Sequence, residues 1–484
     1  MNNNIVSENN IEDKVYSKSR WLILAILVTQ PFMACLDSSI VNVALPTIGQ
    51  KLSITMSSAE WIISSYLIII SAAILIFGRL GDMKGKCKVF LNGILMFVLG
   101  SLLCGISNSI TTLVISRIIQ AIGAAMVMST NQGIITDIFP PNERGKALGI
   151  SGSFVALGSI LGPALGGLII TYLSWNYIFL INIPIGVVAY FFGRKHLPIS
   201  KSTNNVSLDK YGALMFVIST IFIFSSIMLS QQLGFSNIYI LSALIFGIII
   251  FLLFLFIESK IKNPMLDLLL FKNRSFSINL FCAFIAFAAL STVNVIQPFY
   301  LSDILKFSPS EISLIMISYP AVLFIASPLS GSLSDKIGSK KLTLLGLLFT
   351  SISLFLISSL NEHSNKLTIV LVLCLLGLSN GLFQSPNTNL IMSSAPKNKL
   401  GIAGGTNALV RNLGLVFGVS ISTSILYYRM SNVAGYRVLG TIPGRDDIFV
   451  YGMKGVYILA GIVCLIAFIF SLIDGVKSLK SQNN

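Results

Sequence analysis

The sequence predicts an all-α, polytopic membrane protein that crosses a bilayer fourteen times, with two six-helix bundles and two further helices inserted between them. Three observations support this. Of 484 residues, 54% are hydrophobic and only 11% are charged, whereas a soluble domain carries about 25% charged residues. Continuous apolar runs of about 20 residues, long enough for a helix to cross the hydrocarbon core, recur along the chain. Finally, a segment of the first half is repeated in the second.

The apolar runs divide the chain into its predicted parts. Residues 1–20 are polar and precede no cleavage site, so we expect a cytoplasmic tail there and a second one over 475–484. A first bundle is expected over 21–195, an inserted pair of helices over 211–257 and a second bundle over 276–474. The predicted spans lie near 21–46, 57–78, 89–107, 111–136, 147–171, 175–193, 211–230, 237–257, 276–301, 312–333, 342–360, 367–392, 402–427 and 453–474.

The basic residues predict the orientation of these spans. If both termini are cytoplasmic, 24 of the 33 Lys and Arg residues fall in cytoplasmic segments and 7 in outer ones. Such an excess marks the cytoplasmic side of a membrane protein. The net charge of +15 also raises the question of nucleic-acid binding. Because the bases lie in short connections between apolar runs, we interpret them as a topology signal and expect no nucleic-acid partner.

An internal repeat relates the two halves. The segment GRLGDMKGKCK (78–88) follows the second predicted span, and GSLSDKIGSKK (331–341) follows the tenth. A second match pairs STNQ (129–132) with SPNT (385–388). Repeats of this kind place a substrate site at their interface near the bilayer midplane. The matched loop positions are Gly78 and Gly331, Leu80 and Leu333, Asp82 and Asp335, Gly85 and Gly338, and Lys88 and Lys341.

Four motifs carry a resemblance to a known family. GRLGDMKGKCK (78–88) resembles the loop signature of the major facilitator superfamily, and SRIIQAIGAA (116–125) resembles its fourth-helix motif. GSILGPALGG (158–167) is similar to the fifth-helix motif of its antiporters, and LDSSIVNVALP (36–46) to the first-helix motif of its fourteen-span drug:proton antiporters. The resemblance implies the major facilitator fold and an efflux pump that exchanges protons for lipophilic drugs or toxic small molecules.

Asp37 is the only acid deep inside a predicted span. A carboxylate at that depth costs at least about 2.5–3.5 kcal/mol and usually faces a functional cavity. Low dielectric favours the protonated form of a carboxylic acid, which suits proton binding and release. In the fourth span, Gln120 lies at nearly the same depth as Asp37, and Arg117 lies one turn nearer the outer end. The three are expected to form one polar cluster for proton coupling, a role that the resemblance implies for Arg117. Two alternatives stay open: a permanent structural ion pair, and an Arg117 side chain that snorkels to the outer surface.

Arg411 lies near the middle of the thirteenth span, and the second half offers it no acid. It is expected to pair with Asp37, to hold an anionic part of a substrate, or to serve in packing. Further polar residues inside spans are candidates for a substrate cavity, although most such residues hold helices together. They are Gln30, Asn42, Asn131, Asn294, Gln297, Gln384, Asn387 and Asn407.

The repeated loop is predicted to be a conformational switch. Gly78 and Gly85 allow close approach and tight turns. Asp82 is expected to accept hydrogen bonds at a helix N-terminus in the other half and so to hold one conformation. Asp137, at the end of the fourth span, is expected to pair with a loop base such as Arg79.

The fifth span carries a second group of switch candidates. Gly158, Gly162 and Gly166 recur every fourth residue and form a groove in which another helix can pack closely. Pro163 removes a backbone hydrogen bond and favours a bend. Gly167 completes the motif. Packing alone explains this pattern, and its antiporter meaning comes only from the resemblance.

The expected partners are a small-molecule substrate, protons and the lipid bilayer, and the chain is expected to act as a monomer in a bacterial cell membrane. No cofactor or metal is expected, because His196 and His363 lie far apart in connecting loops and no phosphate-binding loop is present. An enzyme is therefore not expected. Two rival functions stay open: an importer or facilitator of a nutrient or osmolyte, and a non-transporting receptor. The tenth span lacks the internal acid that the resemblance associates with transport of dicationic drugs, which argues against dicationic substrates.

Overall fold

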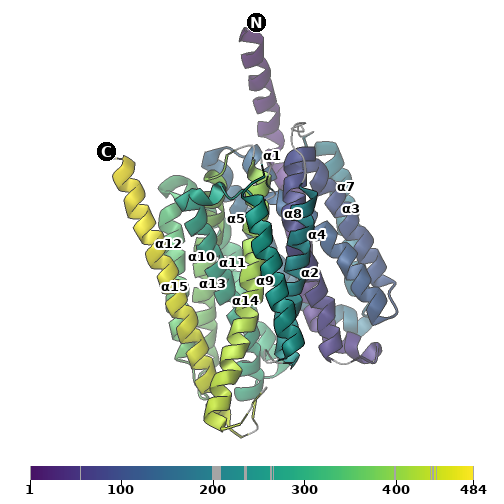
Figure 1. The fold of residues 1–484 in the computed structure, drawn as a ribbon, viewed down its shortest axis with the longest axis vertical. Coiled ribbons are helices and arrows are strands. Elements are labelled where there is room, and N and C mark those ends of the chain that lie inside the picture. The colour runs from purple at the N-terminus through teal and green to yellow at the C-terminus, as the bar shows by residue number, and fades with distance from the viewer. Residues whose placement is uncertain are drawn as a thin grey trace.

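The computed structural model describes residues 2–54, 56–198, 209–233, 237–261, 264, 266–396, 399–436, 438, 441–442 and 444–482. Every regular element in these residues is a helix. Fourteen helical segments within them are long and apolar enough to cross a bilayer, which confirms the predicted fold class. Helices are required there because a bilayer offers no water to satisfy backbone polar groups. Both ends of the chain lie at one end of the bundle, which we name the termini face (Figure 1).

The first half supplies six spans. Its first helix begins in the polar N-terminal segment, where the sequence predicted a tail, and continues without interruption into the first span. The helices are α1 (Asn2–Lys51), α2 (Met56–Lys84), α3 (Lys86–Gly105), α4 (Ile110–Ile138), α5 (Pro141–Tyr172), α6 (Tyr177–Leu180) and α7 (Asn182–His196).

The sixth span is broken between α6 and α7. Pro184 has no N–H to donate to the carbonyl of Leu180, so a regular helix loses a hydrogen bond at this point. Asn182 therefore stands at the first turn of α7, where its side chain is fully buried among the helices of the first half.

Two inserted helices and the second half follow. Helix α8 packs against α9 and α2, so the inserted pair lies beside the first half. The inserted helices are α8 (Lys210–Leu233) and α9 (Ile238–Glu258), and a short 3-10 turn, η1 (Leu270–Lys272), follows them. The second half comprises α10 (Arg274–Phe299), the π-helical turn η2 (Tyr300–Ile304), α11 (Pro309–Ile337), α12 (Ser339–Ser358), α13 (Lys366–Ser393), α14 (Leu400–Ala434) and α15 (Asp446–Gln482).

The internal repeat is visible in the backbone. Gly85 separates α2 from α3 with a φ of 96°, and its repeat mate Gly338 separates α11 from α12 with a φ of 92°. L-amino acids with a Cβ rarely adopt this conformation, whereas glycine does so readily. The two halves thus make the same sharp turn at the same place on the termini face.

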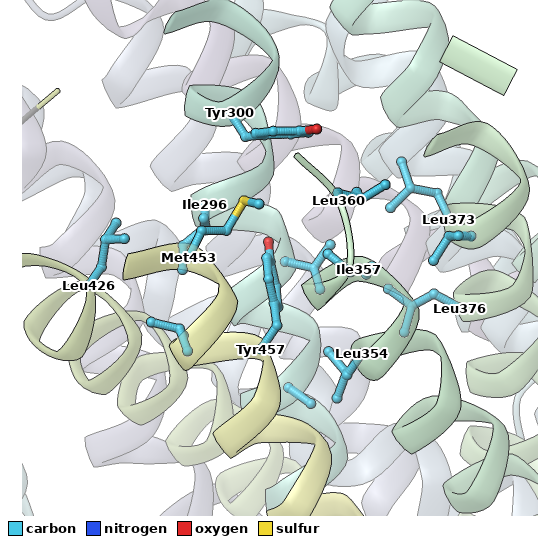
Figure 2. Packing of buried hydrophobic residues seen from close by; sticks show 14 of the residues in the cluster. Ile296, Tyr300, Leu354, Ile357, Leu360, Leu373, Leu376, Leu426, Met453 and Tyr457 are labelled. Carbon is cyan, nitrogen blue, oxygen red and sulfur yellow. The ribbon is translucent and has the colours of Figure 1, made fainter. Parts of the chain in front are cut away.

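The core of the second half is apolar and closely packed. Tyr457 on α15 points among Ile296, Leu354 and Leu376 from three other helices (Figure 2). Its hydroxyl donates to Oε1 of Gln297 at 3.2 Å, so the buried phenol is not left unsatisfied. In a bilayer such contacts stabilise helix packing through van der Waals attraction and interhelical hydrogen bonds.

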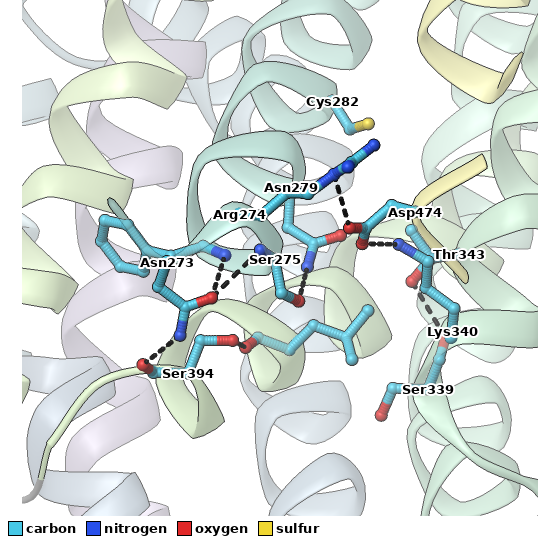
Figure 3. A network of polar contacts seen from close by, with 12 residues as sticks. Asn273, Arg274, Ser275, Asn279, Cys282, Ser339, Lys340, Thr343, Ser394 and Asp474 are labelled. Atoms are coloured by element: carbon cyan, nitrogen blue, oxygen red, sulfur yellow. Dashed lines mark hydrogen bonds and ion pairs between the residues drawn. The ribbon is translucent and has the colours of Figure 1, made fainter. Parts of the chain in front are cut away.

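A polar network joins three helices of the second half at the termini face. Asp474 on α15 pairs with Arg274 on α10 at 3.3 Å and with Lys340 on α12 at 3.0 Å (Figure 3). Asn273 caps α10 by accepting from the backbone N–H of Ser275 at 3.0 Å. The Asp474 side chain is only 10% exposed, so its ion pairs with α10 and α12 are largely shielded from water and help to hold α15 in place.

Replacing Asp474 by Asn should lower the thermal stability of the purified protein. The change leaves Arg274 and Lys340 without their counter-charge, at an expected cost of about 1–3 kcal/mol. The measurement is the melting temperature in detergent, with Asp447→Asn as the matched control. The Arg445–Asp447 pair is more than half exposed on both sides and should contribute little. Equal melting temperatures for the two variants would contradict a stabilising role for Asp474.

Candidate functional site

Asp37 on α1 is the centre of a buried polar cluster in the first half. Its side chain is fully buried. Its Oδ2 accepts from Nη1 of Arg117 at 2.6 Å, and its Oδ1 accepts from Nε2 of Gln120 at 2.9 Å and from Nδ2 of Asn182 at 3.0 Å. Three donors from α4 and α7 thus converge on one buried carboxylate and supply it with hydrogen bonds in place of water.

Arg117 has several partners besides Asp37. Its Nε donates to the carbonyl of Ile62 at 3.1 Å, and its Nη1 also donates to Oε1 of Gln120 at 2.6 Å. The guanidinium carbon lies 4.2 Å from the centroid of the Tyr66 ring, a favourable cation–π geometry. Arg117 is only 1% exposed, so the alternative in which it snorkels to the outer surface is wrong for this structure.

The Asp37–Arg117 ion pair is sensitive to mutation because both charged groups are buried away from water. Removing one partner of a buried ion pair costs about 3–5 kcal/mol, since the other charge is left uncompensated. Sequence reasoning grouped Asp37, Arg117 and Gln120 by depth but missed Asn182. A signal was present: Asn182 is an amide near the middle of the sixth apolar run, two residues before Pro184.

Arg411 on α14 is a second cation inside a span, and it has no acidic partner. It is partly exposed, and its guanidinium carbon lies 4.5 Å from the centroid of the Phe287 ring on α10. Within the described part of the chain it makes no ion pair or hydrogen bond, and its electrostatic neighbours are Cys35 and Tyr319. Because Asp37 is occupied by Arg117, the expected pairing of Asp37 with Arg411 is absent from this conformation.

The remaining substrate-cavity candidates occupy different environments. Gln297 accepts from Tyr457, and Asn387 donates to the carbonyl of Asn279 at 3.1 Å, so both are held inside the second half. Asn42 and Asn294 are exposed, and Gln384 is partly exposed. The five residues therefore differ in burial and in hydrogen-bond partners.

Three further amides are buried near the seam or in the first half. Asn407 on α14 donates to Oε1 of Gln132 on α4 at 2.8 Å, which is a direct contact between the halves. Asn131 is buried, and its Oδ1 has no partner in the described residues. Gln30 on α1 is buried with neither amide atom paired within that same part of the chain. Of the three, only Asn407 bridges the two halves directly.

Asp82, at the end of α2, caps a helix of the other half. Its Oδ1 accepts from the backbone N–H of Gly401 at 2.9 Å, and its Oδ2 accepts from that of Ile402 at 3.0 Å. Both N–H groups belong to the first turn of α14, where the helix dipole favours a negative charge. The contact expected from the sequence is present, and its role as a switch stays a prediction.

The repeat mate of Asp82 makes the reciprocal contact. Asp335, near the end of α11, accepts from the backbone N–H of Gly145 at 2.9 Å and from that of Lys146 at 3.0 Å. These groups lie in the first turns of α5, in the first half. A Cβ on Gly78 would lie 2.9 Å from the carbonyl oxygen of Gly401, so the helices cross too closely for a larger residue.

The base that pairs with Asp137 is Lys86 and not Arg79. Lys86 Nζ lies 2.8 Å from Oδ2 of Asp137 and 3.7 Å from Oδ1 of Asp82. Lys86 thus links the end of α4 to the Asp82 contact. The expectation for Arg79 failed because the helix geometry carries this residue to another side of the loop.

Arg79 faces the connection that follows the inserted helices. It is 7% exposed, and its electrostatic neighbours are Asp82, Asp267 and Glu258. Asp267 also pairs with Lys399, the residue that precedes α14. Asp267, in the connection between α9 and α10, therefore interacts with residues on both sides of the Asp82 contact.

Three glycines of α5 form the surface against which α1 packs closely. A Cβ on Gly158 would lie 2.7 Å from the carbonyl oxygen of Phe32, and one on Gly166 would lie 3.4 Å from Ile40. At Gly162 a Cβ would lie 2.8 Å from the Ser39 hydroxyl, whereas at Gly167 it would meet open space. Gly167 therefore does not belong to the groove that contacts α1. Pro163 lies within α5, and its side chain is outside the described part of the structure.

The seam between the halves is closed at the termini face. Hydrogen bonds cross it from Asp82 and Asp335, from Asn407 to Gln132, and from Ser327 to the carbonyl of Gly149 at 2.9 Å. Each lies in the part of its helix nearer the termini face. This is the geometry of a two-bundle carrier shut at one end.

Two apolar cavities lie away from these residues. One of about 140 Å³ lies between α10, α14 and α15, and one of about 350 Å³ lies between α8 and α9. No charged residue lines either cavity. Their linings are mostly apolar and each lies within one group of helices, away from the seam between the halves, so we assign neither to the substrate.

Fourteen apolar helices in two related halves, with contacts that close one end of the seam, define a multi-pass membrane transporter. The sequence model of the Major Facilitator Superfamily matches residues 27–263 and 280–483. The chain belongs to this superfamily, whose members carry small molecules and are not enzymes in general.

The chain is similar to several bacterial transporters. It is 34% identical to the riboflavin transporter RibZ of Clostridioides difficile, over 96% of this chain and 99% of that protein. It is 29% identical to the multidrug transporter protein MdtP of Bacillus subtilis, over 90% and 81% of the two chains. The human organic anion transporter MFSD10 shares the fold, with a TM-score of 0.65 at 14% identity over 93% and 98% of the two chains.

Replacing Asp82 by Asn should open the termini face more often. The change removes a negative charge from the N-terminus of α14, an interaction worth up to about 2 kcal/mol in a partly buried setting. The measurement is maleimide labelling of a cysteine introduced at Asn407, in a background from which the native cysteines have been removed. Labelling should rise, and Asp335→Asn should raise it similarly.

Asp303→Asn is the matched control for both variants, because Asp303 lies at the opposite end of the second half. Unchanged labelling in Asp82→Asn and Asp335→Asn would show that the two contacts do not hold the seam closed.

Proposed function

We propose that this protein is a proton-coupled antiporter that exports lipophilic drugs or other toxic small molecules across the cytoplasmic membrane. The observation that carries the proposal is the fully buried Asp37, held by Arg117, Gln120 and Asn182. A buried carboxylate with a removable counter-charge is a suitable proton carrier. Similarity to a multidrug transporter supports the substrate class.

Arg117 and Asp37 each have alternative hydrogen-bond partners when Asp37 is protonated. When Asp37 takes up a proton, Arg117 keeps the Ile62 carbonyl, the Gln120 amide oxygen and the Tyr66 ring as partners. A protonated Asp37 needs an acceptor, and Oδ1 of Asn182 has no partner in the described residues. A half-turn of the Asn182 amide would supply that acceptor. Protonation therefore removes the counter-charge of Arg117, while its guanidinium keeps hydrogen-bond and cation–π partners.

The ion pair and the seam connect in a simple cycle. In the present conformation Asp37 accepts three hydrogen bonds, which fits its charged form, and the termini face is closed. With cytoplasmic termini this conformation would take a proton from outside as it releases substrate. Opening of the Asp82 and Asp335 contacts would then expose Asp37 to the cytoplasm, where the proton leaves and a new substrate binds.

Proton coupling should depend on the Asp37 carboxyl. In proteoliposomes with an imposed ΔpH, transport by the wild-type chain should follow the gradient, and Asp37→Asn should abolish this response. Because that variant leaves Arg117 uncompensated, the neutral double variant Asp37→Asn/Arg117→Gln provides the matched control for folding. It should purify as a monodisperse protein and still bind substrate, but transport it independently of ΔpH. Gradient-driven transport by either variant would exclude Asp37 as the proton carrier.

A second candidate function is transport of riboflavin or a similar vitamin. The observation that favours it is the 34% identity with a riboflavin transporter across nearly the whole of both chains, which exceeds the identity with MdtP. The discriminating measurement uses everted vesicles with a preformed proton gradient. Collapse of the gradient on addition of cationic or neutral drugs supports drug antiport, whereas a response to riboflavin alone supports the second candidate.

We also propose that both termini are cytoplasmic, with bundles over 21–195 and 276–474 joined by the inserted pair at 211–257. The support is the excess of Lys and Arg in the segments of the termini face. Fusing a reporter that fluoresces only in the cytoplasm to either end tests the orientation. Fluorescence from both fusions is expected, and a dark fusion at either end would overturn it.

A further inference from the structure

Arg411 carries a positive charge that the described protein does not balance. The residue lies about 16 Å along α14 from its first residue, deep in the span. Every other arginine or lysine that lies this deep in a described span is paired: Arg117 has Asp37. A cation at this depth is normally balanced by an acid, by backbone carbonyls or by a ligand. Arg411 has neither of the first two in the described structure.

The surroundings of Arg411 come from both halves. Its electrostatic neighbours are Cys35 on α1 of the first half and Tyr319 on α11 of the second. Cys35 lies 2.9 Å from the hydroxyl of Ser159 on α5. Arg411 therefore stands at the seam, where the repeat architecture places a substrate. It is also partly exposed and so accessible to a ligand.

Tyr319 gives an independent indication of a missing partner. Its hydroxyl is buried and makes no hydrogen bond to any described residue. Buried hydroxyls are nearly always satisfied, so an unpaired one beside an unpaired guanidinium is unusual. Both groups donate hydrogen bonds, and an acceptor with negative charge would satisfy both.

Phe287 orients the guanidinium. The ring lies 4.5 Å from the guanidinium carbon and covers one part of it. The guanidinium itself is planar and presents its N–H donors as a rigid fork. Such a fork binds a carboxylate through two parallel hydrogen bonds, whereas an ammonium group would act as a point charge.

We infer that Arg411 and Tyr319 form an anion subsite at the seam, and that it binds the carboxylate of a small organic acid with an aromatic or apolar body. The inference rests on the proposed function of the chain as a carrier and names one chemical class of its substrates. Asp37 does not compete for Arg411 here, because Arg117 neutralises it. The ring of Phe287 and the apolar spans suit the body of the same molecule.

Matched pairs of ligands test the subsite directly. The full-length protein in nanodiscs is titrated calorimetrically, without any pH gradient, with 1-naphthoate and 1-pyrenebutyrate and with the methyl ester of each. Wild-type protein should bind at least one carboxylate tenfold or more tightly than its ester. Arg411→Gln should remove this preference and leave the ester affinity unchanged, and Arg411→Lys should restore part of it. Tyr319→Phe should weaken only the carboxylate, by a smaller factor.

Arg429→Gln is the control, because Arg429 lies on the same helix and also stacks on a ring, that of Tyr451 at 4.4 Å. It should keep the wild-type preference. The inference is overturned if wild-type protein prefers no carboxylate over its ester, if Arg411→Gln weakens acid and ester alike, or if the preference survives in that variant.

The same titration separates this inference from the proposed proton coupling. Asp37→Asn/Arg117→Gln should keep the carboxylate preference, since the subsite does not use either residue. If wild-type protein shows the carboxylate preference but its transport does not respond to an imposed ΔpH, proton coupling is refuted and the subsite is supported. A preference that disappears in the double variant would assign the anion to the Asp37 cluster instead and overturn the inference.

Discussion

A charge in the hydrocarbon core of a bilayer must be balanced, and this constraint explains the most unusual side chains of the protein. Asp37 and Arg117 satisfy it with each other at 2.6 Å, and Gln120 and Asn182 complete the shell around the carboxylate. Because these groups come from α1, α4 and α7, the ion pair also holds the first half together. Arg411 meets the same constraint differently, since it stacks on Phe287 and leaves its donors free for a ligand.

The duplicated halves produce a seam with reciprocal contacts. Asp82 caps α14 and Asp335 caps α5, each through two backbone N–H groups of the other half. A carboxylate at a helix N-terminus gives an interaction of moderate strength that depends on close approach. The glycines at the crossing points provide that approach. Contacts of this strength close one end of the protein, and in the proposed cycle they open when substrate or proton binding favours the other conformation.

The inserted helices are more than a spacer between two bundles. Helix α8 packs against α2, and both Glu258 at the end of α9 and Asp267 in the connection that follows it are electrostatic neighbours of Arg79. Asp267 also pairs with Lys399 beside the first turn of α14. The connection therefore interacts with the first half and the second half at the place where Asp82 joins them. Its acids add to the stability of the closed end.

The sequence by itself determined the helical membrane fold, the number of spans, the repeat and the residues that demand partners. The reason is that bilayer thickness fixes span length, and buried charges or repeated Asp and Gly residues stand out against apolar runs. Only the tertiary structure decided the partners: Asn182 for Asp37, Lys86 for Asp137, and Phe287 for Arg411. Depth along a span is readable from residue number, but the direction of a side chain depends on helix rotation, breaks such as that at Pro184, and packing between segments far apart in the chain.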